Sequence, residues 1–122
     1  MSKFIFKDLE LYESQAVSGS AAAYKTTGID LGSATAAESG DYELVIKLTY
    51  SSGTFNFVLE GEEDATIDAS SNTIYTLPAK TASGTFHLPI PKDFGYRYVG
   101  WSVNAVAHAG TVESWVQPIS GK

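Results

Sequence analysis

The stretch Asp41–Glu60, DYELVIKLTYSSGTFNFVLE, carries the clearest structural signal in this 122-residue chain. In its first half, large apolar side chains occupy alternate positions: Tyr42, Leu44, Ile46, Leu48 and Tyr50. A period of two is typical of a β-strand with one buried face. The alternation resumes at Phe55, Phe57 and Leu59 after the turn residues Ser51-Ser52-Gly53. The pattern therefore predicts a β-hairpin over residues 41–60.

Further short alternating stretches follow this hairpin and precede it. Strands are expected over residues 9–17, 22–29, 74–77, 85–90, 96–107 and 111–117. The last two are expected to pair as a second hairpin through the turn His108-Ala109-Gly110. In the strand over 85–90, Phe86, Leu88 and Ile90 should point inward and His87 outward. The polar stretch 61–72 is expected to be a loop that crosses at the sheet edge, with Ile67 as its only large apolar residue.

These patterns predict an all-β fold, a jelly-roll-like β-sandwich of about eight short antiparallel strands. The length and the 43% content of hydrophobic residues suit a single domain over residues 1–122. The chain has no cysteine, which excludes disulfides, thiolate nucleophiles and cysteine-based metal sites.

The charge balance bears on the class of partner. With 8 basic and 14 acidic residues the net charge is −6, which repels phosphate groups, so neither nucleic acid nor an anionic membrane is an expected partner. No apolar run approaches the roughly 18 residues of a membrane span. The opening MSKFIFKDLELYE lacks the apolar core of a secretory signal, so we expect no export by that route.

Motifs for catalysis or cofactor binding are missing from the sequence. It contains no GxSxG, GxGxxG or GxxxxGK[ST] motif. His87 and His108 are the only histidines, and an enzyme using either as a base would need a pocket shared with a carboxylate or hydroxyl. The acidic residues between Glu60 and Asp68 lack EF-hand spacing and are interpreted as a solvated edge and not as a calcium site. We expect no enzyme, cofactor or metal.

Two aromatic residues keep a different function open. Trp101 or Trp115 could stack on a sugar, since aromatic faces are suited to such contacts and lectin-like modules include sandwiches of this size. The alternative hypothesis is therefore a carbohydrate-binding adhesin module. It requires at least one of the two indole rings to lie outside the core.

The amino terminus is unusually rich in large apolar residues. Residues 1–12 are expected to form either a first strand that enters the core or an arm that docks on a partner. The candidates for contact with a capsid or with another subunit are Phe4, Ile5, Phe6, Leu9, Leu11 and Tyr12.

Several short motifs follow one another along the chain in an order that can be compared with known families. Lys7–Val17 (KDLELYESQAV) is followed by a small-residue run, by Ile29-Asp30-Leu31-Gly32, by Arg97-Tyr98-Val99, and by the Ala109-Gly110 turn before a final strand. From Lys7 to Val116 the chain resembles the capsid cement, or decoration, proteins of tailed bacteriophages, of the Bordetella-phage type. It departs from that pattern in Trp101, Trp115 and a longer acidic loop.

The resemblance implies a jelly-roll domain that binds the outside of an icosahedral capsid and stabilises contacts between capsomers, without catalysis or cofactors. The implied partner is the major capsid protein of a tailed phage. The implied location is the outer surface of the virion, after synthesis in the bacterial cytoplasm. Self-association is expected as a homodimer in preference to a trimer. The matched residues Gln15, Asp30 and Arg97 are expected to be structural.

Overall fold

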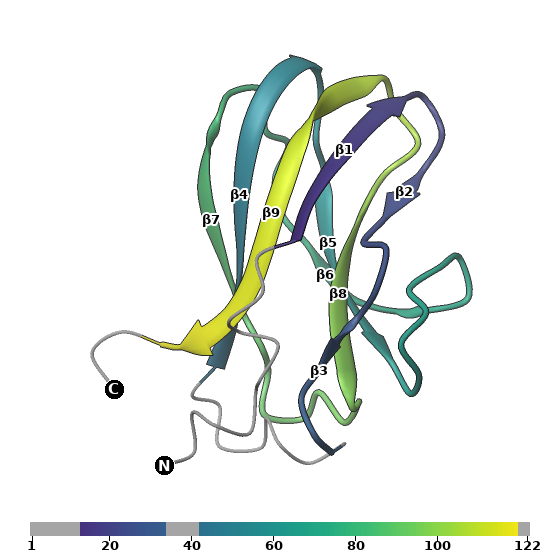
Figure 1. The fold of residues 1–122 in the computed structure, drawn as a ribbon, viewed down its shortest axis with the longest axis vertical. Helices are drawn as coiled ribbons and strands as arrows, with labels where there is room; N and C mark the ends of the chain where they lie inside the picture. Colours follow the sequence, from purple (N-terminus) through teal and green to yellow (C-terminus); the bar gives the residue numbers. More distant parts are fainter. Residues whose placement is uncertain (1–12, 34–41, 120–122) are drawn as a thin grey trace.

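The computed structural model describes residues 13–33 and 42–119, and these contain strands and no helix (Figure 1). The strands are β1 Glu13–Gly19, β2 Ala23–Tyr24, β3 Ile29–Asp30, β4 Tyr42–Gly53, β5 Phe57–Glu62, β6 Asn72–Thr76, β7 Gly84–Pro89, β8 Tyr98–Val103 and β9 His108–Pro118. Over these ranges, no helix is long and apolar enough to cross a membrane. The contact candidates in residues 1–12 lie outside the described residues.

The strands form two antiparallel sheets that pack face to face, as Figure 1 shows. Sheet A has the order β1-β9-β4-β7, and sheet B has the order β2-β8-β5-β6 with β3 also paired to β8. Because β2 and β3 are two-residue strands along the same neighbour, they fill one position, which leaves eight positions in two sheets of four. This is the strand order of a jelly roll, so the predicted fold class is confirmed.

The predicted hairpin over residues 41–60 is wrong, although both of its strands exist. β4 pairs with β7 and β9 in sheet A, whereas β5 pairs with β6 and β8 in sheet B. The chain changes sheets at Gly53, where φ is +82° and an added Cβ would overlap the Ala107 carbonyl oxygen. The alternation of apolar residues shows which face of a strand is buried, but it does not show which strand lies beside it in the sheet.

The second predicted hairpin is wrong for the same reason. β8 belongs to sheet B and β9 to sheet A, so the two strands face each other across the core. His108 was expected in a turn, but it begins β9 and is only 3% exposed. The polar stretch 61–72 does not cross at an edge, because it joins β5 and β6, which are neighbours in sheet B.

The core confirms the predicted inward faces. Leu44, Ile46 and Leu48 of β4 are at most 2% exposed. On β7, Leu88 is fully buried, Phe86 packs against the core and His87 is exposed, as expected. Trp101 of β8 is fully buried, with its ring 6.0 Å from that of Phe57 in an edge-to-face contact and its indole N–H 3.2 Å from Ser114 Oγ. Burial of these side chains supplies most of the stability.

Side-chain hydrogen bonds close the sandwich along both edges. On one side, the Gln15 amide of β1 donates to the Tyr24 carbonyl of β2 at 2.8 Å and accepts from the Thr26 backbone N–H at 2.9 Å. On the other side, the Tyr75 hydroxyl of β6 donates to the Pro89 carbonyl of β7 at 2.6 Å. The bonds to the Tyr24 and Pro89 carbonyls each join a strand of one sheet to a strand of the other, so they limit separation of the sheets.

A bidentate ion pair between Arg97 and Asp30 joins β3 to the segment that leads into β8. Arg97 donates from Nε to Asp30 Oδ1 at 2.8 Å and from Nη2 to Asp30 Oδ2 at 2.9 Å. The Arg97 guanidinium holds the pKa of the Asp30 carboxyl below its usual value. Gln15, Asp30 and Arg97 thus all join elements of the fold.

We expect Asp30→Asn to lower the free energy of unfolding at pH 7 by at most about 1 kcal/mol, because the pair is partly exposed and screened by solvent. A lowered pKa in the folded state gives stability that is present above the unfolded pKa and is lost as the pH falls through the folded one. Urea unfolding of the wild type and of Asp30→Asn at pH 7 and pH 2.5 should therefore show a smaller difference in the free energy of unfolding at the lower pH. A difference that does not change with pH would contradict this role for the pair.

Candidate functional site

The outer face of sheet A carries a polar and aromatic cluster that includes no residue of the hydrophobic cluster between the sheets. The register places Trp115 of β9 and His87 of β7 on either side of Val45 of β4. In the next row, Gln117 and Pro89 flank Glu43. Directly opposed residues of antiparallel strands point to the same side, so these side chains share one face. We call Trp115, Gln117, Glu43, His87 and Val45 the Trp115 face.

Three hydrogen bonds connect the polar members of the Trp115 face. The Trp115 indole N–H donates to Gln117 Oε1 at 2.8 Å, and Gln117 Nε2 donates to Glu43 Oε2 at 2.9 Å. His87 Nδ1 lies 3.0 Å from the same carboxylate oxygen. Because an ionised carboxylate only accepts, His87 Nδ1 carries the hydrogen and Gln117 has a defined amide orientation. The bonds hold the half-buried indole ring of Trp115 in a fixed orientation.

The two tryptophans therefore have different environments. Trp101 is fully buried, so it cannot stack on a sugar, and that part of the adhesin hypothesis is wrong. Trp115 is partly exposed on the outer face. Its partner in the register, Val45, is 1% exposed although it lies outside the core cluster. Trp115 provides an aromatic surface with polar groups beside it, an arrangement suited to protein or sugar contacts.

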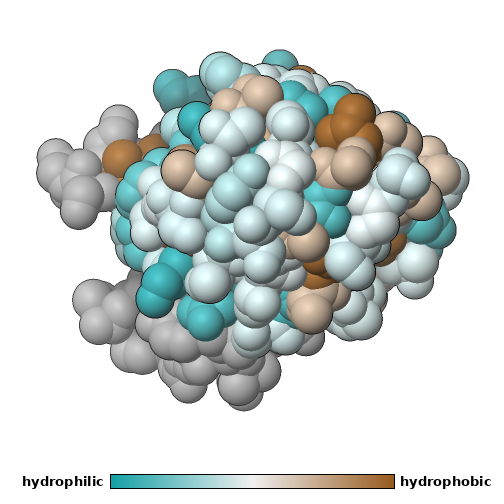
Figure 2. Space-filling model, turned by 90° about the horizontal axis from the view of Figure 1, so that it is seen from above, coloured by the Kyte–Doolittle hydropathy of each residue, from teal (hydrophilic) through white to brown (hydrophobic). Residues whose placement is uncertain are grey.

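Large hydrophobic side chains are rarely exposed on the described surface. Val106 is the one large hydrophobic residue classed as exposed within 13–33 and 42–119. Figure 2 shows the end of the sandwich seen from above, where hydrophobic groups form separate small spots in a pale or hydrophilic surface. Scattered apolar residues are normal for a protein surface. Trp115 is thus an aromatic side chain with polar groups beside it, while several tyrosines elsewhere on the described surface are also partly exposed.

The histidines do not form a catalytic arrangement with a hydroxyl among the described contacts. His87 contacts the Glu43 carboxylate on a sheet face. His108 lies 2.6 Å from the Val106 carbonyl through Nδ1, and its Nε2 is buried without a hydrogen-bond partner. Since a carbonyl only accepts, the hydrogen of neutral His108 is on Nδ1. His108 packs beside the Phe55 ring, so its environment is that of a core residue.

The acidic residues after Glu60 are held by local hydrogen bonds. Asp64 Oδ1 accepts from the Thr66 backbone N–H, and Asp68 Oδ1 accepts from Ser70. Within the described parts of the chain, no three His, Asp or Glu side chains are grouped to hold a metal ion. The outward polar residues Glu43 and Gln117 were not predicted as site residues, because their proximity depends on strand pairing that alternation does not reveal.

The structure does not place the predicted contact residues Phe4, Ile5, Phe6, Leu9, Leu11 and Tyr12, which precede its first described residue. That residue, Glu13, is paired with Ser114, the neighbour of Trp115 in β9. The described chain thus begins beside the strand that carries the Trp115 face. No protein-family model and no curated protein matches this sequence.

Proposed function

We propose that this chain is a non-enzymatic head decoration protein of a tailed phage. It binds the outer surface of the assembled icosahedral capsid, contacts the major capsid protein and stabilises contacts between capsomers. In this role it acts by adhesion, so it needs neither a cofactor nor a catalytic group. Its location is the outer surface of the virion.

The Trp115 face is the observation that carries this proposal. Interface hot spots are enriched in tryptophan, and polar groups commonly surround the aromatic anchor. Trp115 is held by Gln117, which is itself held by Glu43, so little side-chain freedom is left to lose on binding. The face lies on a four-stranded sheet that is braced along both edges, so it presents a rigid surface.

Two further observations support the assignment. The positions through which the chain resembles decoration proteins, Gln15, Asp30 and Arg97, all have bracing roles in the sandwich. Jelly rolls are common among viral capsid proteins, although a fold by itself does not determine function. We also propose that two copies associate as a dimer, because a second contact to the lattice then becomes intramolecular and strengthens attachment.

Co-sedimentation tests the proposal. Purified protein would be mixed with emptied heads that lack it, and bound protein would be measured against free protein. We expect saturable binding at a fixed number of copies per head. Heads that already carry the protein serve as the control and should bind no more. Failure to bind at any ratio would exclude the decoration role.

Carbohydrate binding is a second candidate because Trp115, and not Trp101, lies on the surface. Sugar rings stack on aromatic faces, and the exposed His87 on the same face as Trp115 offers a ring nitrogen for a bond to a sugar hydroxyl. A glycan array separates the two candidates. Selective binding that is lost in Trp115→Ala, together with no binding to heads, would favour the adhesin.

A further inference from the structure

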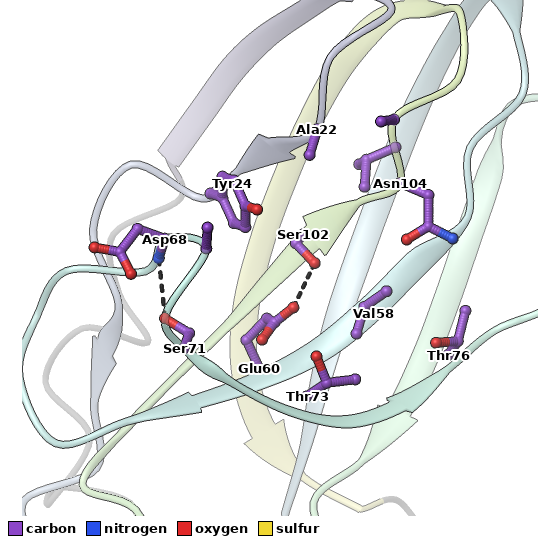
Figure 3. A pocket seen from close by; sticks show the side chains of 13 residues that line it. Ala22, Tyr24, Val58, Glu60, Asp68, Ser71, Thr73, Thr76, Ser102 and Asn104 are labelled. Carbon is purple, nitrogen blue, oxygen red and sulfur yellow. Dashed lines mark hydrogen bonds between the residues drawn. The ribbon is translucent and has the colours of Figure 1, made fainter.

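The outer face of sheet B, on the opposite side of the sandwich from the Trp115 face, contains a polar pocket of about 210 Å³ (Figure 3). One row of outward residues crosses its floor from β2 to β6: Tyr24, Ser102, Val58 and Thr76. Glu60 of β5 and Thr73 of β6 belong to the next row. The pocket is smaller than the roughly 300–1,000 Å³ of sites for drug-sized ligands, so it suits a single small group.

The loop between β5 and β6 forms one wall of this pocket. Ile67 anchors the loop, since it is 4% exposed and sits over Gly100, where an added Cβ would lie 2.8 Å from Ile67 Cγ1. The anchored loop brings Asp68, Ala69 and Ser71 to the rim. The Asp68 backbone N–H donates to Ser71 Oγ at 2.9 Å, as Figure 3 shows, and this bond fixes the turn.

Glu60 is the chemically distinctive group in the pocket. It is 4% exposed and Ser102 Oγ donates to its Oε2 at 2.5 Å. Among the described residues Ser102 is the hydrogen-bond partner of this carboxylate, which points into the pocket (Figure 3). Burial raises the pKa of Glu60, which reflects the cost of holding this charge without a cation.

The charge of the pocket defines the ligand that fits it. Glu60 and Asp68 are both acidic, and the described residues that line the pocket include no Lys, Arg or His. The lining also offers hydroxyl and amide acceptors at Thr73 and Asn104. A guanidinium suits this site because it is planar, carries five donors and sheds water more readily than an ammonium does.

We propose that this pocket binds a guanidinium group, the side chain of an arginine presented by a partner protein. The guanidinium would pair with the Glu60 carboxylate. Asp68, whose Oδ1 is bonded to Ser70, adds only longer-range attraction at the rim. This site lies on a different sheet from the Trp115 face, so it goes beyond the proposed function. Its test requires no phage heads, so the two proposals can fail separately.

The test is a titration followed by amide chemical shifts in the full chain. The four probes are methylguanidinium, urea, the blocked peptide acetyl-Gly-Arg-Gly-amide and free L-arginine. Urea is planar like a guanidinium but neutral, and it is used at millimolar concentration. We expect saturable shifts around Glu60, Asp68 and Ser102 with methylguanidinium and none with urea. The blocked peptide presents the guanidinium without the α-ammonium and α-carboxylate charges of free arginine, and it should bind at least as tightly if the pocket takes an arginine side chain from a protein.

Matched variants identify the group responsible. Glu60→Gln should weaken methylguanidinium binding about tenfold or more, since a charged hydrogen bond is lost. Glu63→Gln removes the same charge from an exposed position of the same loop outside the pocket lining and should bind nearly as the wild type does. Asp68→Asn, on the exposed rim, should give an intermediate loss and provides a second test if Glu60→Gln does not fold.

Two outcomes would overturn the site: equal binding by wild type, Glu60→Gln and Asp68→Asn, or equal chemical-shift changes with urea and with methylguanidinium. Tighter binding of free arginine than of the peptide would overturn the protein partner.

Discussion

Trp101→Ala is expected to lower the free energy of unfolding by about 3–5 kcal/mol, the usual cost of removing a large buried aromatic side chain. Trp101 is fully buried between the sheets, where its ring meets Phe57 edge to face. The variant would leave a cavity and would also remove the donor to Ser114 Oγ. Since domains are stable by only about 5–15 kcal/mol, this loss is a large fraction of the total stability. Urea unfolding followed by far-UV circular dichroism measures the change.

Two variants make this prediction specific. Trp101→Phe keeps an aromatic ring and should lose less stability than Trp101→Ala. Trp115→Ala removes the same side chain from the outer face, where it is partly exposed, and should also cost less. A loss below about 1 kcal/mol in Trp101→Ala would contradict its assignment to the core.

Trp115→Ala is expected to weaken attachment to phage heads by about thirtyfold or more, equivalent to the roughly 2 kcal/mol that defines an interface hot spot. The variant removes the aromatic anchor of the Trp115 face and the N–H that fixes Gln117. Co-sedimentation at several protein concentrations gives the ratio of affinities. Unfolding curves measured in parallel show whether the variant remains folded under the binding conditions.

An exposed polar residue of the same sheet provides the control for this binding experiment. Thr85→Ala changes an exposed residue of β7 in the same sheet, two positions from His87, and should leave binding nearly unchanged. Gln117→Ala should have an intermediate effect, because Trp115 stays while its hydrogen-bonded support is lost. Wild-type binding by folded Trp115→Ala would remove the Trp115 face from the contact.

Much of the fold could be predicted from the sequence because strand faces follow directly from alternation. Leu44, Ile46 and Leu48 are inward, and His87 is outward, as their spacing predicts. Both predicted hairpins are wrong because alternation leaves the pairing partner undetermined. The segment Ser51-Ser52-Gly53, expected as a turn, lies within β4 beside a shift in its pairing with β9, and the chain crosses to the opposite sheet after Gly53.

The candidate sites were less predictable for the same reason. Glu43, His87 and Gln117 belong to three different strands, so only the register brings them together. Glu60 and Ser102 likewise meet through the pairing of β5 with β8. Ile67, a single apolar residue in a polar loop, was the one sequence signal that the loop packs on the sheet.

The most direct test of the decoration role is the disruption temperature of emptied heads that lack the protein. It would be measured by light scattering before and after addition of purified wild-type protein, with Trp115→Ala as the matched addition. Wild-type protein at saturation should raise the disruption temperature, and Trp115→Ala at the same concentration should raise it much less. An unchanged disruption temperature with wild-type protein at saturation would contradict the proposal that this chain stabilises the capsid.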